Sequence, residues 1–325
     1  MKTKVLKALK ECDGYLSGQE LCSQLGVSRA AVWKVIRQLE GEGYDIEAVR
    51  NRGYRLVGQK NAFGQAELEC CLDGSFGKPV QYYPVVDSTN TRAKALAEEG
   101  ASHGTLVVAD CQESGKGRRG RSWTSPSGVN LYMSLILRPD ILPSLASMVT
   151  LVAALAVRKG ILETAGCETQ IKWPNDLVSG GKKVCGILTE MSAELEGIHY
   201  IVVGIGINAN IDAFPPEVAE TATSIFLETG ERISRSRLAA AVMKAFEEYY
   251  DQFIEAGSLK NLVDEYNEKM ANKDRTVKVL DPAGEYQRVA LGINEKGELL
   301  VKTDSGHIRR IVSGEVSVRG IYGYV

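Results

Sequence analysis

The chain has 325 residues, of which 44% are hydrophobic and 25% charged, and its formal net charge is −2. This length predicts two or three domains, and the composition is that of an ordinary globular protein. No apolar run approaches the ~20 residues of a membrane helix, and the N-terminus lacks the apolar core of a signal peptide, so we expect a cytoplasmic protein without a membrane segment. Seven cysteines without a C-x-x-C pair and three scattered histidines argue against a zinc site or a disulfide framework.

Positive charge is concentrated near the N-terminus. Residues 1–60 contain eleven Lys and Arg and seven Asp and Glu, a net of +4, so the remainder carries −6. A basic module beside an acidic body predicts a local contact with a polyanion.

The first 40 residues show the pattern of three short helices. Apolar residues at helical spacing predict the first helix over residues 2–11. Ser17 is placed to cap a second helix that ends near Gly26, and Ser28 to cap a third over residues 29–40. Two capped helices joined by a short turn are typical of a helix-turn-helix, and we expect Gly58–Gln65 to form a linker behind this module.

A basic hairpin follows over residues 46–57, with its turn at Asn51-Arg52-Gly53. Together these elements predict a winged helix, whose third helix would read base edges while the hairpin arginines meet phosphates. The alternative is a small structural helical domain with solvated charges. The expected DNA-contacting residues are Ser28, Arg29, Ala30, Trp33, Lys34, Arg37, Arg50, Arg52 and Arg55.

From residue 81 onward, strand and helix patterns alternate. A strand over 81–86 ends in D-S-T-N, a helix follows over 91–99, and a second strand over 105–112 ends at Gln112. Asp87 or Ser88 could cap the helix, and this is compatible with ligand binding because helix N-termini also bind polar ligands.

The stretch 114–132 reads S-G-K-G-R-R-G-R-S-W-T-S-P-S-G-V-N-L-Y. Glycines permit close approach of the backbone, and arginine offers forked donors to carboxylate and phosphate, so this loop is suited to wrap an anion. Its spacing fits G-x-G-x-x-G, but a second strand follows instead of a helix, which excludes a dinucleotide-binding turn. The alternative is a solvated, disordered basic loop.

The remaining elements are simpler. Residues 148–162 predict a buried helix, and strands are expected over 169–172, 184–191 and 200–207, the last two as a hairpin. Residues 209–224 suggest a flexible cover, and 238–256 and 259–270 suggest amphipathic helices. Five short strands with turn residues between them, over 272–325, predict a small barrel.

Four motifs together resemble those of biotin protein ligases: the glycine-rich loop, I-K-W-P-N-D at 171–176, K-V-C-G-I-L at 183–188 and G-I-G-I-N at 204–208. The N-terminal module narrows the resemblance to the bifunctional type, which is both ligase and biotin operon repressor. The implied fold is α+β: a winged helix-turn-helix over 1–62, a mixed α/β, class II synthetase-like ligase domain over 63–271, and an SH3-like β-barrel over 272–325. Gly314, Glu315 and Arg319 resemble positions that face the active centre in this family.

The resemblance implies a biotin–acetyl-CoA-carboxylase ligase. Such an enzyme activates biotin with ATP and Mg²⁺ to biotinyl-5′-AMP, then transfers biotin to a lysine of the biotin carboxyl carrier protein. It also implies binding to operator DNA as a homodimer promoted by biotinyl-5′-AMP. Mg²⁺ is expected to be held through ATP, with no metal ligand assigned among the protein side chains.

The resemblance also implies roles for individual residues. Arg118, Lys183, Arg121 and Asp176 are the expected catalytic residues, and Lys116 stands where many relatives have arginine, so it keeps the charge but loses the fork. The expected biotin-binding residues are Ser88, Thr89, Asn90, Gln112, Lys116, Gly117, Arg118, Lys183, Gly186, Gly204 and Gly206. The expected ATP- or adenylate-binding residues are Gly115, Arg119, Arg121, Trp123, Asn130, Lys172, Asn175, Ile207 and Asn208.

Two alternatives stay open at this point. One is a transcription factor whose ligase-like body only senses a small acid, against which the complete basic loop and Lys183 argue. The other is a lipoate-type ligase, against which the neutral polar residues at 88–90 and Gln112 argue, because they suit a ureido ring better than a dithiolane.

Overall fold

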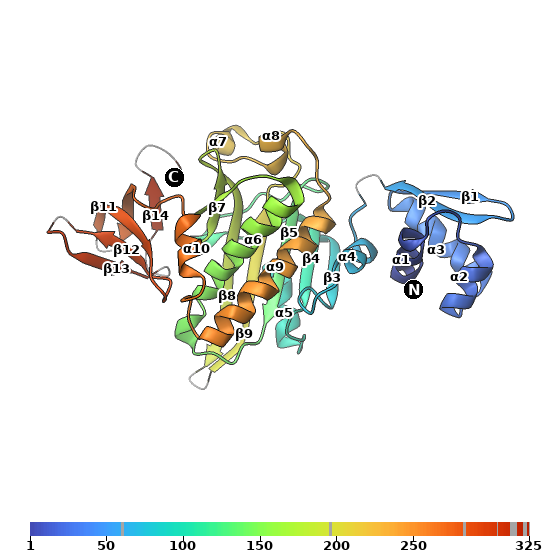
Figure 1. Cartoon of the computed structure of the whole chain (residues 1–325), viewed down its shortest axis with the longest axis horizontal. Coiled ribbons are helices and arrows are strands. Elements are labelled where there is room, and N and C mark those ends of the chain that lie inside the picture. Colours follow the sequence, from blue (N-terminus) through green and yellow to red (C-terminus); the bar gives the residue numbers. More distant parts are fainter. Residues whose placement is uncertain are drawn as a thin grey trace. The chain divides into compact units, whose positions relative to one another are not determined.

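The computed structural model describes residues 1–59, 62–194, 197–281, 284–303, 305–312, 317–320 and 324. Its internal contacts divide the chain into two compact units, Met1–Asp73 and Gly74–Val325. Figure 1 shows both, coloured along the sequence. The first unit extends beyond the boundary predicted at residue 62, and the three-domain division stays a prediction.

The first unit has the helices and the hairpin predicted from the sequence. Ser17 Oγ accepts a hydrogen bond from Glu20 N, and Ser28 Oγ accepts one from Ala31 N, so both predicted caps are confirmed. The apolar residues of the three helices pack into one core. The elements are α1 (Lys2–Glu11), α2 (Gly18–Leu25), α3 (Arg29–Gly41), β1 (Tyr44–Val49), β2 (Gly53–Gln59) and α4 (Gln65–Cys71).

The hairpin is fixed to the helices at the start of β2. Strands β1 and β2 pair antiparallel, and Tyr54 and Leu16 exchange two backbone hydrogen bonds of 2.8 and 2.9 Å. Gly53 has a φ of 113°, and a Cβ at this position would lie 2.1 Å from the Leu16 carbonyl oxygen. Only glycine fits this junction without displacing the backbone.

Helix α4 is fastened to the first unit by a buried carboxylate. Glu67 is 2% exposed, and its oxygens accept hydrogen bonds from Lys10 Nζ at 2.6 and 2.7 Å and from Tyr44 Oη at 2.5 Å. Burial and this hydrogen bond raise the pKa of Tyr44 well above its ordinary value. A buried charge needs such partners, which explains why the helix behind the predicted linker packs with the first unit.

The second unit is built on a seven-stranded mixed sheet in the order β3-β4-β5-β9-β8-β7-β6. Only β3 and β4 pair in parallel among the described strands, and every other neighbouring pair is antiparallel. The strands are β3 (Val80–Val86), β4 (Leu106–Gln112), β5 (Leu131–Leu137), β6 (Gln170–Lys172), β7 (Asp176–Ser179), β8 (Lys182–Glu194) and β9 (Gly197–Ile207).

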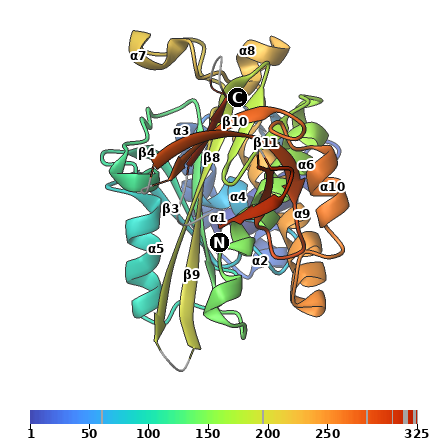
Figure 2. The ribbon, with the colours of Figure 1, turned by 90° about the vertical axis from the view of Figure 1, so that its left-hand side faces the viewer.

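Helices cover both faces of this sheet. Figure 2 shows α5 (Thr89–Glu98) on one side, and α6 (Met148–Ala165) with α9 (Arg235–Ala256) on the other. Helix α6 is buried along most of its length, as its apolar sequence predicts. The helical stretch Pro143–Ala165 is long and apolar enough to cross a membrane, but 72% of its most apolar window is buried inside the protein, as in a core helix.

The predicted β8–β9 hairpin is confirmed. One strand was missed, and one predicted helix has the wrong extent. Strand β7 was not predicted, because four residues after a proline give too short a pattern. The helix predicted over 259–270 is wrong in extent: α10 covers only Val263–Glu268. Met270 instead forms a parallel bridge with Ile171, so the chain must leave the helix before it.

The C-terminal segment forms a five-stranded antiparallel sheet in the order β13-β12-β11-β10-β14, so the predicted strands are confirmed. Gly314 and Glu315 lie outside the described residues, and Arg319 is described only as a backbone position of β14. The strands are β10 (Thr276–Asp281), β11 (Gly284–Ile293), β12 (Leu299–Lys302), β13 (Ile308–Ile311) and β14 (Ser317–Gly320).

The junction at Gly53 gives a testable prediction. We expect Gly53→Ala to destabilise the first unit by about 1–3 kcal/mol or more, since the new methyl group meets the Leu16 carbonyl and the positive φ becomes strained. Hydrogen exchange of the β1–β2 amides measures this loss. Gly41→Ala is the matched control, because a Cβ there meets nothing within 4 Å. Unchanged protection in Gly53→Ala would contradict the steric account.

Candidate functional site

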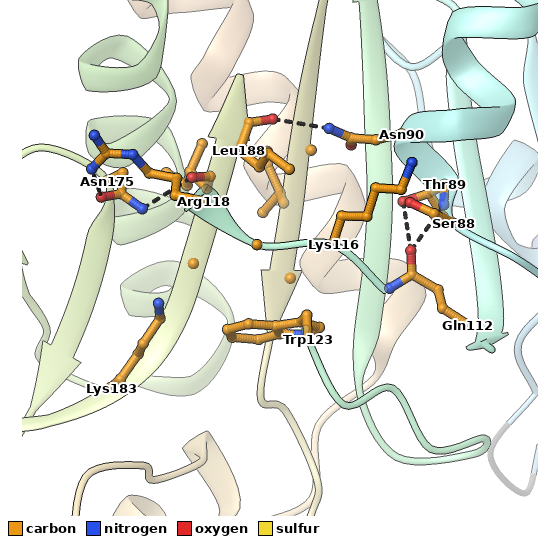
Figure 3. A pocket seen from close by; sticks show the side chains of 16 residues that line it. Ser88, Thr89, Asn90, Gln112, Lys116, Arg118, Trp123, Asn175, Lys183 and Leu188 are labelled. Carbon is orange, nitrogen blue, oxygen red and sulfur yellow. Dashed lines mark hydrogen bonds between the residues drawn. The ribbon is translucent and has the colours of Figure 1, made fainter. Parts of the chain in front are cut away.

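A pocket opens between the N-terminus of α5, the glycine-rich loop and the middle of strands β8 and β9. Figure 3 shows Ser88, Thr89 and Gln112 on one side and Arg118, Asn175 and Lys183 on the other. All eleven residues predicted to bind biotin line this pocket. The full lining is Ser88, Thr89, Asn90, Gln112, Lys116, Gly117, Arg118, Trp123, Asn175, Lys183, Gly186, Ile187, Leu188, Gly204, Ile205 and Gly206.

Gln112 caps helix α5. The helix begins at Thr89, two residues earlier than predicted, and Ser88 occupies the N-cap position without a capping hydrogen bond from its side chain. Gln112 Oε1 instead accepts hydrogen bonds from Thr89 N at 2.9 Å and from Thr89 Oγ1 at 3.1 Å. The capping alternative for Ser88 is therefore wrong, and this leaves its hydroxyl as a donor or acceptor at the pocket wall.

Asn90 is held by the protein itself. Its Nδ2 donates to the Leu188 carbonyl at 3.1 Å and to Glu190 Oε2 at 2.8 Å, and its Oδ1 accepts from Ser134 Oγ at 2.6 Å. Both amide hydrogens have partners, so Asn90 mainly joins α5 to β8 and shapes the pocket. Burial acts to raise the pKa of Glu190, but hydrogen bonds from Lys94 and Asn90 bring it below its ordinary value.

Three glycines of β8 and β9 make room for other side chains. A Cβ on Gly204 would lie 2.0 Å from Asn90 Oδ1, and one on Gly206 would lie 2.7 Å from the Trp123 indole. On Gly186 it would lie 3.0 Å from both Trp123 and Lys183. The indole therefore rests on bare backbone. Trp123 Nε1 is buried without a hydrogen-bond partner among the described residues, a state that costs about 1–3 kcal/mol.

The glycine-rich loop is a small hairpin. Gly117 N donates to the Arg121 carbonyl at 2.7 Å, and Trp123 N donates to the Gly115 carbonyl at 2.8 Å. At its tip, residues Arg118–Gly120 form a 3₁₀ turn in which Arg119 has a φ of 58°. Thus no long helix follows the loop, in agreement with the sequence.

Arg118 attaches this loop to the far end of the sheet. Its Nη1 donates to Asn175 Oδ1 at 2.7 Å. Burial lowers the pKa of the Arg118 guanidinium, and the charge of Asp176 acts in the opposite direction. The guanidinium thus lies at the pocket, where an anionic ligand can meet it.

An ion pair joins β7 and β8 beside Arg118. Lys183 Nζ lies 2.6 Å from Asp176 Oδ1, which also accepts a hydrogen bond from Asn175 Nδ2 at 3.0 Å. The Lys183 side chain is 23% exposed and that of Asp176 13%. Lys183 Nζ lies 5.2 Å from the centroid of the Trp123 ring. Lys183 is therefore a fixed cation of the pocket and not a solvated lysine at a strand start.

A second hollow adjoins this pocket and shares Trp123 and Lys183 with it. It holds four residues predicted to bind ATP: Arg121, Trp123, Asn130 and Asn208. The predicted cover forms its outer wall from Ile211 to Ala222 and contains the short helix α7 (Pro216–Ala219). Backbone hydrogen bonds from Lys183 N to Thr221 O and from Thr223 N to Lys183 O fix the end of the cover to β8.

The other predicted ATP residues lie elsewhere. Asn175 lines the first pocket, and Arg119 lines a neighbouring hollow with Arg118. Gly115 and Ile207 are packed inside, since a Cβ on Gly115 would lie 2.3 Å from the Trp123 carbonyl and Ile207 is fully buried. Lys172 is 5% exposed and lies 3.3 Å from the centroid of the Tyr324 ring.

Sequence reasoning missed two polar residues of the site. Ser134 Oγ donates to Asn90 Oδ1 and lies 2.8 Å from Thr89 Oγ1, inside an otherwise apolar strand pattern in which a lone polar residue was the available signal. Tyr324 lines the second hollow and donates a hydrogen bond to Asp176 Oδ2. Nothing in the C-terminal sequence distinguishes this tyrosine from a strand-end residue.

The nine residues predicted to contact DNA are all exposed on the first unit. Arg52 and Arg55 lie 4.8 and 5.0 Å from the centroid of the Tyr15 ring, a residue that the sequence did not single out. Arg37 lies 5.5 Å from the ring of Trp33, which is 55% exposed. These cation–π contacts order the long side chains of the three arginines.

Comparisons with known proteins match three separate segments of the chain to family models. Residues 2–55 match the model of an HTH domain, residues 82–208 that of the biotin/lipoate A/B protein ligase family, and residues 274–319 that of the biotin protein ligase C-terminal domain. The bifunctional ligase/repressor BirA of Bacillus subtilis is 41% identical, over 94% of this chain and 94% of that protein. The chain belongs to the bifunctional biotin ligase/repressor family.

A second relative and one solved structure support the same assignment. The bifunctional ligase/repressor BirA of Escherichia coli is 32% identical over 93% of this chain and 92% of that protein. The structure of biotin protein ligase from Aquifex aeolicus in complex with biotin and ATP superposes with a TM-score of 0.66, at 35% identity, over 75% of this chain and 99% of that one. The family's ligase fold is thus the fold of the second unit.

The contact between Gly204 and Asn90 gives a second prediction. We expect Gly204→Ala to lower stability by roughly 1–3 kcal/mol, because the new methyl group overlaps an amide held by three hydrogen bonds. Thermal unfolding of Gly204→Ala, Asn90→Ala and the double variant measures the coupling. The double variant should lose less than the sum of the two singles, since truncation of Asn90 makes room. Strict additivity would show that the two residues do not meet.

Proposed function

We propose that this chain is a biotin protein ligase that also represses transcription. It converts biotin and ATP to biotinyl-5′-AMP and pyrophosphate, and then transfers biotin from the adenylate to a lysine of a biotin carboxyl carrier protein. One observation carries the proposal: a pocket with a polar end at Ser88, Thr89 and Gln112 and a cationic end at Arg118 and Lys183 adjoins a second hollow, and the two share Lys183 and Trp123. Family membership supports it.

The pocket suits the two ends of biotin. The ureido ring is neutral, with two N–H donors and one carbonyl, and it fits the end formed by Ser88, Thr89 and Gln112. The carboxylate fits the end with Arg118 and Lys183. ATP would occupy the second hollow, with adenine near Trp123 and Asn208 and with Arg121 near the phosphates. Lys116, Gly117, Gly186, Gly204 and Gly206 would line the space along biotin.

Adenylation brings a carboxylate to the α-phosphate, so charge accumulates where two anions meet. Cations fixed in advance stabilise that charge, which is the main device available to this site. Lys183, held at 2.6 Å from Asp176, lines both the pocket and the second hollow, and Arg118, held by Asn175, lines the pocket. Asp176 orients Lys183. No enzyme nucleophile is required, because the adenylate itself carries the activated acyl group.

Mg²⁺ is proposed to enter with ATP. Among the described residues, no three His, Cys, Asp or Glu side chains are grouped to hold a metal ion. The donor set at the pocket is cationic and amidic, which suits phosphates and not a bare divalent cation. The ion would supply charge neutralisation of the phosphates, while the protein residues position them.

Lys183 provides the test of the catalytic assignment. Lys183→Met keeps the apolar stem and removes the ammonium, so adenylate formation should slow by about 10²–10³, equivalent to roughly 2–4 kcal/mol in the transition state. Release of pyrophosphate measures the rate. The control is Lys182→Met, whose exposed Nζ lies 3.4 Å from the Ala219 carbonyl and which should keep the wild-type rate. A Lys183→Met enzyme within a few-fold of wild type would remove Lys183 from the mechanism.

The repressor function is proposed to reside in the first unit. The N-terminal part of α3, with Ser28, Arg29 and Ala30, would meet base edges together with Trp33, Lys34 and Arg37, and the hairpin arginines would meet phosphates. One winged helix offers few base-reading side chains, so two copies are needed for a tight operator complex. We propose that biotinyl-5′-AMP promotes this homodimer by ordering the glycine-rich loop and the cover, and that the protein acts in the cytoplasm.

Sedimentation of the full chain tests this coupling. We expect biotinyl-5′-AMP to strengthen dimerisation more than biotin does, and operator DNA to favour the adenylate-bound dimer reciprocally. Arg52→Ala is the control: it should weaken DNA binding and its salt dependence while leaving dimerisation unchanged. An identical monomer–dimer constant with and without the adenylate would contradict the regulatory proposal and leave the ligase proposal intact.

A further inference from the structure

The C-terminal end of the chain reaches the site through Tyr324. This residue lines the second hollow together with Trp123, Asn130 and Asn208. Its hydroxyl donates a hydrogen bond to Asp176 Oδ2, across a sequence separation of 148 residues. A penultimate residue thus touches the carboxylate that holds Lys183.

The ring of Tyr324 covers a second lysine. Lys172 Nζ lies 3.3 Å from the ring centroid, and Lys172 is only 5% exposed. A desolvated ammonium over an aromatic face is stabilised by the ring's quadrupole without losing its charge. The ring therefore shields the Lys172 ammonium from water on one side.

The hydroxyl completes the hydrogen bonding of Asp176. Oδ1 receives Lys183 Nζ at 2.6 Å and Asn175 Nδ2 at 3.0 Å, and Oδ2 receives the phenol. With donors on both oxygens the carboxylate cannot rotate without breaking a bond. Because a phenol is neutral, it fixes Asp176 without adding a charge that would compete with Lys183 for a phosphate.

We propose that Tyr324 is a positioning residue of the adenylation site. Its hydroxyl fixes Asp176 and through it Lys183, and its ring forms part of the nucleotide wall over Lys172. The proposal rests on the proposed ligase function. It makes Tyr324 more important for binding ATP, whose hollow the residue lines, than for binding biotin, which it would affect only through Lys183.

Two substitutions separate the ring from the hydroxyl. In steady-state adenylate formation, Tyr324→Ala should raise KM for ATP about tenfold, because the aromatic ring over Lys172 is lost. KM for biotin should stay within about twofold of the wild type. Tyr324→Phe keeps the ring, so it should keep KM for ATP and lower kcat by about threefold to tenfold. Tyr249→Phe is the control: this buried tyrosine of α9 loses the same kind of bond, to Glu265 Oε1 at 2.7 Å, outside the pocket and the second hollow.

A double-mutant cycle tests the route through Asp176. In an Asp176→Asn background the effect of Tyr324→Phe on kcat should shrink to near unity, because the phenol then has no carboxylate to fix. Equal effects of Tyr324→Phe in both backgrounds would overturn the proposal. So would a Tyr324→Ala enzyme whose KM values for ATP and biotin change by the same factor, which a general structural defect would produce.

Calorimetric titration measures ATP binding without requiring adenylate formation, so it tests the role of Tyr324 separately from the ligase function. ATP is titrated into the full-length wild type and into Tyr324→Ala, each with unfolding temperature measured in parallel. We expect weaker ATP binding by about tenfold in Tyr324→Ala and no change in biotin binding. Equal ATP affinities would overturn the role of Tyr324 even if the wild type makes adenylate. A wild type that binds ATP through Tyr324 but makes no adenylate would refute only the ligase function.

Discussion

The charged half of the site depends on the Asp176 carboxylate. It is the anion around which Lys183, Asn175 and Tyr324 are arranged, and Asn175 in turn accepts the hydrogen bond from Arg118. Partly buried cations repel one another strongly where the effective dielectric is low, so a carboxylate among them is required to keep them together. Through this one group the glycine-rich loop, strand β8 and the C-terminal end of the chain meet at one point.

The other half of the pocket is organised mainly by neutral groups, and the Glu190 carboxylate also holds Asn90 there. Gln112 caps α5, Ser134 supports Thr89 and Asn90, and Gly204 yields the space that Asn90 fills. Fixed neutral donors and acceptors at one end, with fixed cations at the other, match a ligand that has a polar neutral head and an anionic tail. The indole of Trp123 lines both the pocket and the second hollow, and its buried Nε1 has no hydrogen-bond partner among the described residues.

The sequence predicts the local parts of this structure well, because their causes are local. Ser17 and Ser28 cap helices through hydrogen bonds three residues away, and the β8–β9 hairpin follows from its own apolar pattern. The residues expected to bind biotin follow from a resemblance that covers nearly the whole chain. Composition alone would not have selected Gly204 or Gly186.

What the sequence could not predict depends on long-range contacts. The capping of α5 by Gln112 spans 23 residues, and the contact of Tyr324 with Asp176 spans 148. The helix predicted at 259–270 is cut short by the pairing of Met270 with Ile171, a contact invisible to periodicity. Helix α4 joins the first unit because Glu67 needs Lys10 and Tyr44, and no pattern in the linker reveals this.

The central claim is that this pocket couples biotin to the α-phosphate of ATP. The most direct measurement incubates the full chain with ATP labelled on its α-phosphate and with biotin, lipoate or no acid, and separates the products by chromatography. We predict labelled biotinyl-5′-AMP with biotin only, and its consumption when a biotin carrier domain is added. Absence of a labelled adenylate with biotin, or equal formation with lipoate, would contradict the account.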